Sequence, residues 1–179
     1  DKAAPQISPD GKRLAYRAAD EGVLNVWVRT VGRTDDKAVT QDRKRGIRSY
    51  FWAQNNEQIL YIQDKGGDEN WHLYAVNLNT NEEKDLTPFE NVQARVEAVE
   101  QKFPNEILVS INNRNAQLHD VYRADLTTGK LTLVAQNDEG FIGWTADHDF
   151  RVRLAAKMNP DGGTTLVVRD EAESGWRTL

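Results

Sequence analysis

The segment "SPDGKRLAY" at residues 8–16 has a similar copy in "AQNNEQILY" at residues 53–61. Each copy begins with four turn-forming residues, continues with a polar pair, and ends with three residues, the last of which is a tyrosine. The two tyrosines, Tyr16 and Tyr61, are 45 residues apart. Self-similarity at a fixed spacing of this size indicates a repeat architecture.

The remainder of the chain repeats at nearly the same spacing. "NVWVRT" at 25–30 matches "HLYAVN" at 72–77 with an offset of 47 residues, and Tyr122 follows Tyr74 by 48 residues. The same offset of 47 relates Val39–Thr40 to Leu86–Thr87. We therefore expect four approximate repeats, at residues 5–46, 47–91, 92–139 and 140–179.

Each repeat contains short apolar runs that are rich in Val, Ile, Leu, Tyr and Thr and are separated by Gly, Pro, Asn and Asp. Such runs are typical of antiparallel strands joined by tight turns. The expected strands are 13–18, 23–31, 58–63, 72–78, 106–111, 120–126, 131–135, 151–156 and 164–169. A helix competes only at 91–103, where the alternation of apolar and polar residues favours a strand. The sequence predicts an all-β chain.

A period of about 45 residues that holds four short strands is the sequence pattern of β-propeller blades. The chain is long enough for about four blades, which we interpret as a partial propeller. Gly11 and Gly129 supply the positive φ that hairpin turns require. The five tryptophans fall on or beside strands, where we expect them to pack between blades: Trp27, Trp52, Trp71, Trp144 and Trp176.

Charge and hydropathy exclude several classes of partner. The net charge is −5 with the two signs interspersed, whereas binding to nucleic acid requires a basic face. The one basic cluster, "RKR" at 43–45, is interpreted as a solvated loop. No apolar run approaches the roughly 20 residues of a membrane span, so we expect a soluble chain, with a cytoplasmic location favoured over a periplasmic one.

The chain contains no cysteine, which excludes disulfides and thiolate zinc sites. It opens with "DKAAPQ", which has neither an initiator methionine nor the apolar core of a signal peptide. The sequence is therefore expected to be an excised segment.

The stretch "QDKGGDENWH" at 63–72 has the residue inventory of an active site or a metal loop. We favour a hairpin tip, in which Gly66 and Gly67 turn the chain and the acids stay hydrated. Its acids lack the spacing of a calcium loop, and the three histidines of the chain share no ligand spacing. His72 is expected to point outward or to meet a neighbouring strand. No metal site and no cofactor are predicted.

Catalytic patterns are also missing from the sequence. None of the serines lies in the G-x-S-x-G turn that exposes a nucleophile. A glycine-rich phosphate loop and the H-E-x-x-H pattern do not occur either. The sequence predicts no catalytic residue in this chain.

Several stretches closely resemble the N-terminal β-propeller of serine peptidases of the prolyl oligopeptidase (S9) family, in its bacterial dipeptidyl aminopeptidase or acylaminoacyl peptidase-like branch. "SPDGK" also recurs in TolB-type and other WD40-like propellers, whereas "RGIRSYFW" followed by "GDENWHLY" is more specific. "LNVWV" and "VYRADLTTGKL" belong to the same resemblance. It covers essentially the whole chain and is strongest from Pro5 to Leu78.

The resemblance implies a propeller that caps an α/β-hydrolase domain carrying a Ser, Asp and His triad, and this chain lacks that domain. The chain is then a noncatalytic, substrate-gating portion of a hydrolase that cleaves short peptides. The candidate gating residues lie before the innermost strand of the second blade (Arg45, Arg48 and Tyr50) and at a hairpin tip (Asp68, Glu69 and Asn70). An arginine can hold a peptide carboxylate, and an acid can hold an amino terminus.

Two alternatives come from other classes of protein. A TolB-like propeller would bind partner proteins without catalysis. A propeller enzyme of the glycosidase or lactonase type would need facing carboxylates, but Asn77 and Asp125 occupy equivalent repeat positions and are interpreted as repeat architecture.

The expected partners are peptide substrates and the hydrolase domain of the parent enzyme. A partial propeller also exposes blade faces and edges, which favours self-association, including a homodimer that completes one ring.

Overall fold

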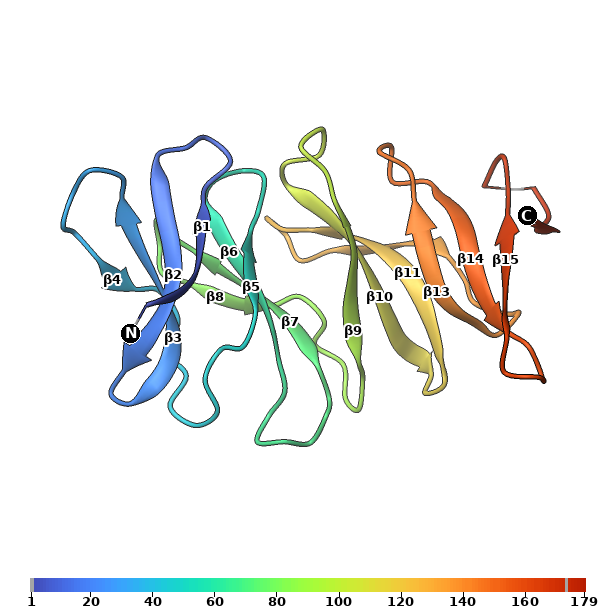
Figure 1. Ribbon diagram of the computed structural model, residues 1–179, viewed down its shortest axis with the longest axis horizontal. Helices are drawn as coiled ribbons and strands as arrows, with labels where there is room; N and C mark the ends of the chain where they lie inside the picture. The colour runs from blue at the N-terminus through green and yellow to red at the C-terminus, as the bar shows by residue number, and fades with distance from the viewer. Residues whose placement is uncertain (1, 173) are drawn as a thin grey trace. The chain divides into compact units, whose positions relative to one another are not determined.

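The computed structural model describes residues 2–172 and 174–179. Within these residues the chain forms sixteen β-strands and no helix, so no helix among them has the length and apolar character needed to cross a membrane. The strands build four antiparallel sheets of four strands each, and neighbours in every sheet are consecutive in sequence (Figure 1). The all-β class and the four-stranded blades are confirmed.

The chain divides into two compact units, residues 1–88 and 89–179. The first unit holds two sheets. Their strands are β1 (Ala3–Ile7), β2 (Arg13–Asp20), β3 (Val23–Thr30) and β4 (Lys37–Ala38), then β5 (Tyr50–Trp52), β6 (Gln58–Gln63), β7 (His72–Asn77) and β8 (Glu83–Asp85).

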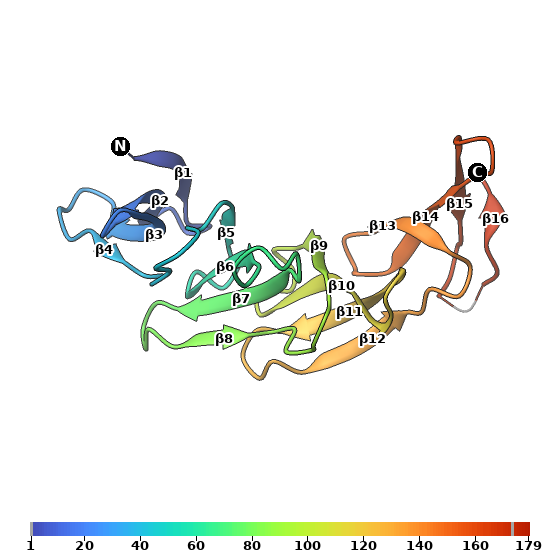
Figure 2. The same ribbon diagram turned by 90° about the horizontal axis from the view of Figure 1, so that it is seen from below.

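The second unit holds the other two sheets, in which consecutive strands lie side by side (Figure 2). Their strands are β9 (Ala94–Val99), β10 (Glu106–Asn115), β11 (Leu118–Asp125) and β12 (Leu131–Ala135), then β13 (Phe141–Ala146), β14 (Val152–Met158), β15 (Thr164–Val168) and β16 (Arg177–Thr178). The strand expected within 91–103 is therefore β9, and the competing helix does not form.

Each unit buries a core between its own two sheets. In the first unit, Val26 and Val28 of β3 share one cluster with Trp52 of β5 and Ile59 of β6. In the second unit, Leu108 and Val121 share a cluster with Val152, against which Trp144 and Trp176 pack. A blade hides one face only against its neighbour, because a single twisted sheet has no interior. The expected packing role of Trp52, Trp144 and Trp176 is confirmed.

The predicted repeat is visible in side-chain hydrogen bonds. Thr40 and Thr87, which the sequence places 47 residues apart, are both buried. The Oγ1 of Thr40 accepts from the backbone N–H of Val26 at 2.9 Å, and the Oγ1 of Thr87 accepts from that of Leu73 at 3.0 Å. In both sheets a threonine after the fourth strand therefore ties the chain back to the third strand.

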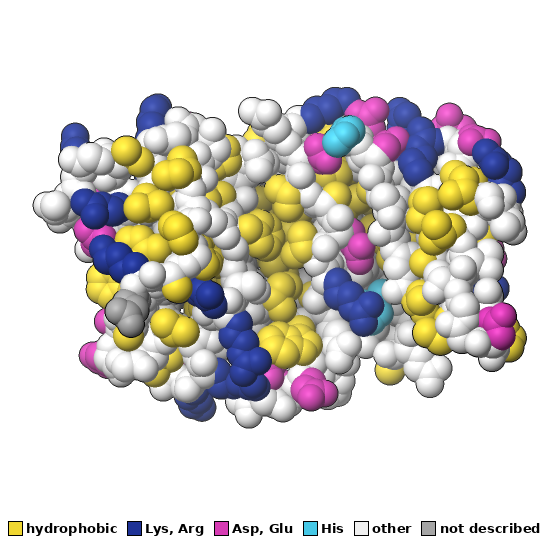
Figure 3. Space-filling model, in the orientation of Figure 1, with side chains coloured by type: hydrophobic (Ala, Val, Ile, Leu, Met, Phe, Trp, Pro, Cys, Tyr) yellow, Lys and Arg dark blue, Asp and Glu magenta, His cyan; other side chains and the backbone are white. Residues whose placement is uncertain are grey.

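Hydrophobic side chains remain exposed on both units. In the second unit they include Ile142 of β13, Met158 of β14 and Leu166 of β15, and Figure 3 shows such side chains over β13 and β14. In the first unit they include Leu24 and Val31.

Candidate functional site

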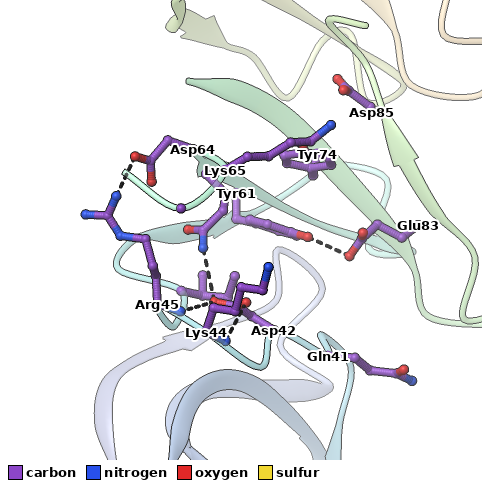
Figure 4. A pocket seen from close by; sticks show the side chains of 13 residues that line it. Gln41, Asp42, Lys44, Arg45, Tyr61, Asp64, Lys65, Tyr74, Glu83 and Asp85 are labelled. Carbon is purple, nitrogen blue, oxygen red and sulfur yellow. Dashed lines mark hydrogen bonds and ion pairs between the residues drawn. The ribbon is translucent and has the colours of Figure 1, made fainter. Parts of the chain in front are cut away.

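Two segments of the first unit carry most of the predicted contact residues. The crossover, residues 39–49, connects β4 to β5, and the β6–β7 loop, residues 64–71, joins the second and third strands of the next sheet. Both segments line a cavity of about 660 Å³ (Figure 4). The cavity also reaches Tyr61 and Tyr74 and the outermost strand of the sheet at Glu83 and Asp85.

Asp42 shapes the crossover. Its carboxylate accepts the backbone N–H groups of Lys44 and Arg45, each at 3.1 Å, and that of Gly46. It also accepts the side-chain amide of Gln63 in β6 at 3.1 Å. One carboxylate thus closes the turn and ties it to the second sheet, which fixes the direction in which Arg45 leaves the backbone.

Gly46 lets the crossover dock on β3. Its φ is +78°, and a Cβ at this position would lie 3.0 Å from the Cβ of Leu24 and 3.1 Å from its backbone nitrogen. The next residue, Ile47, donates its N–H to the carbonyl of Leu24 at 2.7 Å and is buried in the core. Glycine is needed here both for the left-handed backbone and for the close approach.

Arg45 and Asp64 form an ion pair between the crossover and the β6–β7 loop. The Nη1 of Arg45 lies 2.5 Å from the Oδ2 of Asp64, and the two side chains point toward each other in Figure 4. The side chain of Asp64 is 2% exposed and that of Arg45 is 27% exposed. The expectation that the acids of this loop stay hydrated is therefore wrong for Asp64. A carboxylate at this depth requires a cationic partner, and Arg45 supplies it.

The tip of the β6–β7 loop is organised by Asp68. Its Oδ1 accepts the backbone N–H of Asn70 at 3.0 Å and that of Lys65 at 3.2 Å. The bond from Asn70 leads the contributions that lower the pKa of Asp68, so this exposed carboxylate carries its charge at neutral pH. Glu69 is exposed, has a φ of +59°, and donates its N–H toward the Oδ2 of Asp64 at 3.4 Å. The hairpin-tip interpretation of this stretch is confirmed.

Tyr61 and Tyr74, two rings of an aromatic column, form another wall of the cavity. The rings of Tyr61 and Tyr74 stack with centroids 5.2 Å apart, and the ring of His72 stacks on Tyr74 at 6.2 Å. The hydroxyl of Tyr61 donates to Glu83 at 2.5 Å. Burial raises the pKa of Tyr74 to about 12, and burial followed by the bond to Glu83 raises the pKa of Tyr61 still further. Both tyrosines are neutral hydrogen-bonding groups at physiological pH.

The structure brings only some of the predicted gating residues together. Arg45 and the loop tip of Asp68, Glu69 and Asn70 meet through Asp64. Arg48 is exposed, its carbonyl accepts from the guanidinium of Arg17, and its own guanidinium has no partner among the described residues.

Tyr50 belongs to the interior. It is the first residue of β5, whereas the sequence placed it before that strand. Its hydroxyl donates to the carbonyl of Ala4 at 2.5 Å, and burial raises its pKa to about 12. The side chain therefore fastens β1 to the next sheet.

Sequence patterns missed the partners that build the site. The solvated-loop interpretation of "RKR" is wrong for Arg45, which pairs with the buried Asp64, whereas Arg43 is exposed and lies 2.9 Å from Asp20. The Nδ1 of His72 lies 2.7 Å from Asp85 in β8. Of the two expected alternatives, pointing outward or meeting a neighbouring strand, the structure therefore shows the second. One available signal was an acid at the end of the second strand in the first two sheets, with Asp20 as the last residue of β2 and Asp64 directly after β6.

The described part of the chain shows neither a serine–histidine pair of the catalytic type nor a metal-binding cluster. None of its histidine nitrogens is hydrogen-bonded to a serine hydroxyl, and the Ser110 hydroxyl instead donates to Glu97 at 2.5 Å. No group of three or more His, Cys, Asp or Glu side chains suited to a metal ion occurs among these residues. The site offers charged and aromatic contacts for a ligand.

Four-stranded antiparallel sheets in sequence order, packed face to face in pairs, define a protein of the β-propeller class. No protein-family model matches the chain. It is 48% identical over 177 residues to dipeptidyl aminopeptidase BIII of Pseudoxanthomonas mexicana. This alignment covers 98% of the present chain and 26% of that protein. It is 31% identical over 179 residues to dipeptidyl peptidase family member 6 of Caenorhabditis elegans, covering 96% and 24%. The chain thus spans about a quarter of the length of these relatives.

Solved structures agree on the fold at low sequence identity. Oligopeptidase B from Leishmania major matches with a TM-score of 0.66 at 15% identity, covering 98% of this chain and 26% of that one. The β-propeller domain of the Trilobed protease from Pyrococcus furiosus matches with a TM-score of 0.61 at 18% identity, covering 99% of this chain and 56% of that one. TolB from Acinetobacter baumannii matches with a TM-score of 0.59 at 14% identity, covering 100% of this chain and 43% of that one. The chain is a β-propeller segment of the prolyl oligopeptidase (S9) family.

Proposed function

We propose that the chain is the noncatalytic, substrate-gating part of a serine peptidase that cleaves short peptides, of the dipeptidyl or acylaminoacyl type. The observation that carries the proposal is the 48% identity to a dipeptidyl aminopeptidase, which extends over nearly the whole chain but over only 26% of that relative. The catalytic groups then belong to an α/β-hydrolase domain outside these 179 residues.

Exclusion is the physical basis of gating. A ring of blades over an active-site cavity admits short or unfolded chains and rejects folded proteins by size. Polar side chains at the entrance then select among the peptides that fit. In this chain Arg48, Asp68 and Glu69 are exposed and charged, and the proposal assigns such contacts to them.

The six candidate residues divide into two roles in this proposal. Arg48 offers a guanidinium to a peptide carboxylate, and Asp68, Glu69 and Asn70 offer oxygen atoms to a peptide ammonium or backbone N–H. Arg45 and Tyr50 contribute to the gate through the loop and the strand that they hold in place. All of these contacts are reversible, so they affect binding of the peptide and leave the chemical step to the hydrolase domain.

The first test is fluorophosphonate labelling of the full-length native gene product, followed by mapping of the labelled residue. A labelled serine outside this segment supports the proposal. A well-folded product that does not label contradicts it and favours a TolB-like binding module, whose propeller shares the fold at a TM-score of 0.59. Cleavage of a short peptide and of the same peptide embedded in a folded protein then tests gating, and equal rates would contradict it.

Self-association of the isolated segment is part of the proposal. The exposed hydrophobic side chains Ile142, Met158 and Leu166 favour contact with a second copy. Light scattering across a range of concentrations should show a mass that rises with concentration. A constant monomer mass would contradict this part of the proposal.

A further inference from the structure

Two of the three arginines of the crossover, Arg43 and Arg45, contact the hairpins of successive sheets. Arg43 pairs with Asp20 at 2.9 Å and with Glu21 at 3.5 Å, at the turn between β2 and β3. Arg45 pairs with Asp64 at 2.5 Å, where β6 passes into the β6–β7 loop. The basic crossover is therefore attached to the equivalent hairpin in both sheets of the first unit.

The two attachments differ in burial. The side chains of Arg43 and Asp20 are 46% and 26% exposed, whereas that of Asp64 is 2% exposed. Exposed ion pairs stabilise a protein little, because water screens the charges and two mobile side chains lose entropy. A buried carboxylate that loses its partner is left without compensation, so the loop that follows Asp64 depends strongly on this contact. Arg45–Asp64 is the attachment that controls its loop.

The same pair also contacts the backbone of the loop. The Oδ2 of Asp64 accepts from Arg45 and lies 3.4 Å from the N–H of Glu69. The guanidinium of Arg45 lies over Gly67, because a Cβ added there would stand 3.0 Å from its Nη1. Left-handed backbone occurs at Gly66, Gly67 and Glu69, with φ values of +71°, +96° and +59°. Glycine adopts positive and negative φ about equally, so the local bonds to Asp68 and the attachment through Arg45 together select this shape.

We propose that the Arg45–Asp64 pair is a positioning element that holds the β6–β7 loop in one conformation before any ligand binds. Arg45 is accordingly a positioning residue, and its influence on a ligand passes through Asp68, Glu69 and Asn70. Holding the loop in its bound form in advance removes the ordering cost from binding. The positioning is a property of this chain alone, while its use in peptide selection rests on the proposed function.

Amide hydrogen exchange of the 179-residue chain, followed by NMR, tests the positioning directly. The N–H groups of Lys65 and Asn70, which donate to Asp68, report on the loop, and that of Leu73, which donates to Thr87, reports on the core. Asp64→Asn should accelerate exchange of the loop amides by about tenfold or more and leave Leu73 unchanged. Unchanged loop exchange, or an equal acceleration at Leu73, would overturn the proposal.

Asp170→Asn is the matched control for Asp64→Asn. Asp170 pairs with Arg177 at 3.3 Å, but both side chains are largely exposed, at 76% and 60%. The same chemical change at this pair should leave exchange of the Lys65 and Asn70 amides at the wild-type rate. Faster loop exchange in this control would mean that the loop responds to any lost charge, and the proposal would fail.

A pair of glycine variants keeps the test decisive if Asp64→Asn does not fold. Gly66 and Gly67 share a left-handed backbone, but a Cβ at Gly66 meets nothing within 4 Å, whereas one at Gly67 meets Arg45. Gly67→Ala should accelerate loop exchange more than Gly66→Ala, and the difference should vanish when Arg45→Ala is added to both. A difference that persists without the arginine side chain would overturn the proposal.

Kinetics of the longer peptidase that contains this segment separate positioning from the proposed function. Asp64→Asn should raise KM for short peptides severalfold with kcat unchanged, and Asp170→Asn should change neither. Loop exchange that accelerates while KM stays constant would support the positioning and remove the loop from substrate binding. A fall in kcat with no change in loop exchange would overturn the positioning.

Discussion

Asn77 and Asp125 build the same hydrogen-bonded turn in two different sheets. The Oδ1 of Asn77 accepts from the N–H groups of Asn79 and Thr80 at 2.8 and 3.1 Å, and its carbonyl accepts from that of Asn81 at 2.8 Å. The Oδ1 of Asp125 accepts from Thr127 and Thr128, both at 2.8 Å, and its carbonyl accepts from Gly129 at 2.8 Å. Asn81 and Gly129 both have positive φ. The equivalence expected from the repeat is thus a shared turn.

Replacing either residue by alanine should weaken its own turn. Asn77→Ala and Asp125→Ala each remove a side-chain acceptor for two backbone N–H groups, so we expect each to lower the free energy of unfolding by about 1 kcal/mol. Urea unfolding followed by fluorescence measures both values. Asn79→Ala, an exposed neighbour in the same turn, is the control and should cost less. A cost at one site only would contradict the equivalence of the two turns.

The threonine after the fourth strand should matter more, because it is buried. Thr87→Val keeps the shape of the side chain but leaves the N–H of Leu73 without its acceptor, which should cost about 1 to 3 kcal/mol. Thr40→Val should cost a similar amount, since its Oγ1 serves Val26 and also donates to Asn25 at 2.8 Å. Thr132→Val, at an exposed site in β12, should be nearly neutral. Equal stability of all three variants would show that these bonds contribute nothing.

The close approach of Gly46 to Leu24 predicts that alanine destabilises the fold more at Gly46 than at Gly11. Gly11 has a φ of +75° with no atom within 4 Å of an added Cβ, whereas Gly46 has a similar φ and a crowded site at Leu24. Gly11→Ala should cost about 1 to 2 kcal/mol through backbone strain. Gly46→Ala should cost roughly 2 to 4 kcal/mol, because the crossover must also shift away from β3. Thermal unfolding of both variants checks the order, and equal costs would exclude a role for the contact.

Glu97 should give the second unit a pH dependence. Burial raises the pKa of its carboxyl, against smaller lowering effects of the bond from Ser110 and the charge of Arg95. A raised pKa means that the folded chain favours the protonated form. Its stabilising contribution is complete below the ordinary value of 4.5 and is lost as the pH rises through the raised pKa.

Glu97→Gln removes this titration, so its stability relative to wild type should increase as the pH rises above 4.5. Urea unfolding between pH 4 and 8 provides the measurement. Glu139→Gln, at an exposed site in the same unit, should follow the wild-type profile. A wild-type profile for Glu97→Gln would contradict the raised pKa.

Arg48 provides the kinetic prediction for the gate. Its guanidinium is exposed and has no partner among the described residues, so its removal should leave the fold intact. In the longer peptidase, Arg48→Ala should raise KM for short peptides by about tenfold if it pairs with a peptide carboxylate, with little change in kcat. Arg33→Ala, at an exposed position before β4, should not change KM. An unchanged KM for Arg48→Ala would remove the residue from the gate.

Side-chain pattern predicted the central strands and missed several of the outer ones, among them β4 and β8. The apolar runs at 58–63 and 72–78 coincide with β6 and β7, which are buried along most of their length and are therefore mainly apolar. The outermost strands β4 and β8 have the sequences "KA" and "EKD", which contain no such run. They are strands only because β3 and β7 offer them backbone hydrogen bonds, and that information lies in another part of the chain.

The candidate site shows the same division. Asp68, Glu69 and Asn70 were identified from their turn-forming composition, which is a local property. Arg45 was identified from its charge, but its partner Asp64, 19 residues away, was not identified.

The sequence by itself determined the repeat, the strand class and the turns, because these depend on the order and spacing of neighbouring residues. Only the tertiary structure decided that Tyr50 is buried, that Arg43 and Arg45 are paired, and that Asp64 lies out of water. Burial and ion pairing depend on which segments meet in space, and a hydrogen bond or an ion pair forms only at contact distance. The partner of a charge is therefore fixed by the packing of one blade against the next.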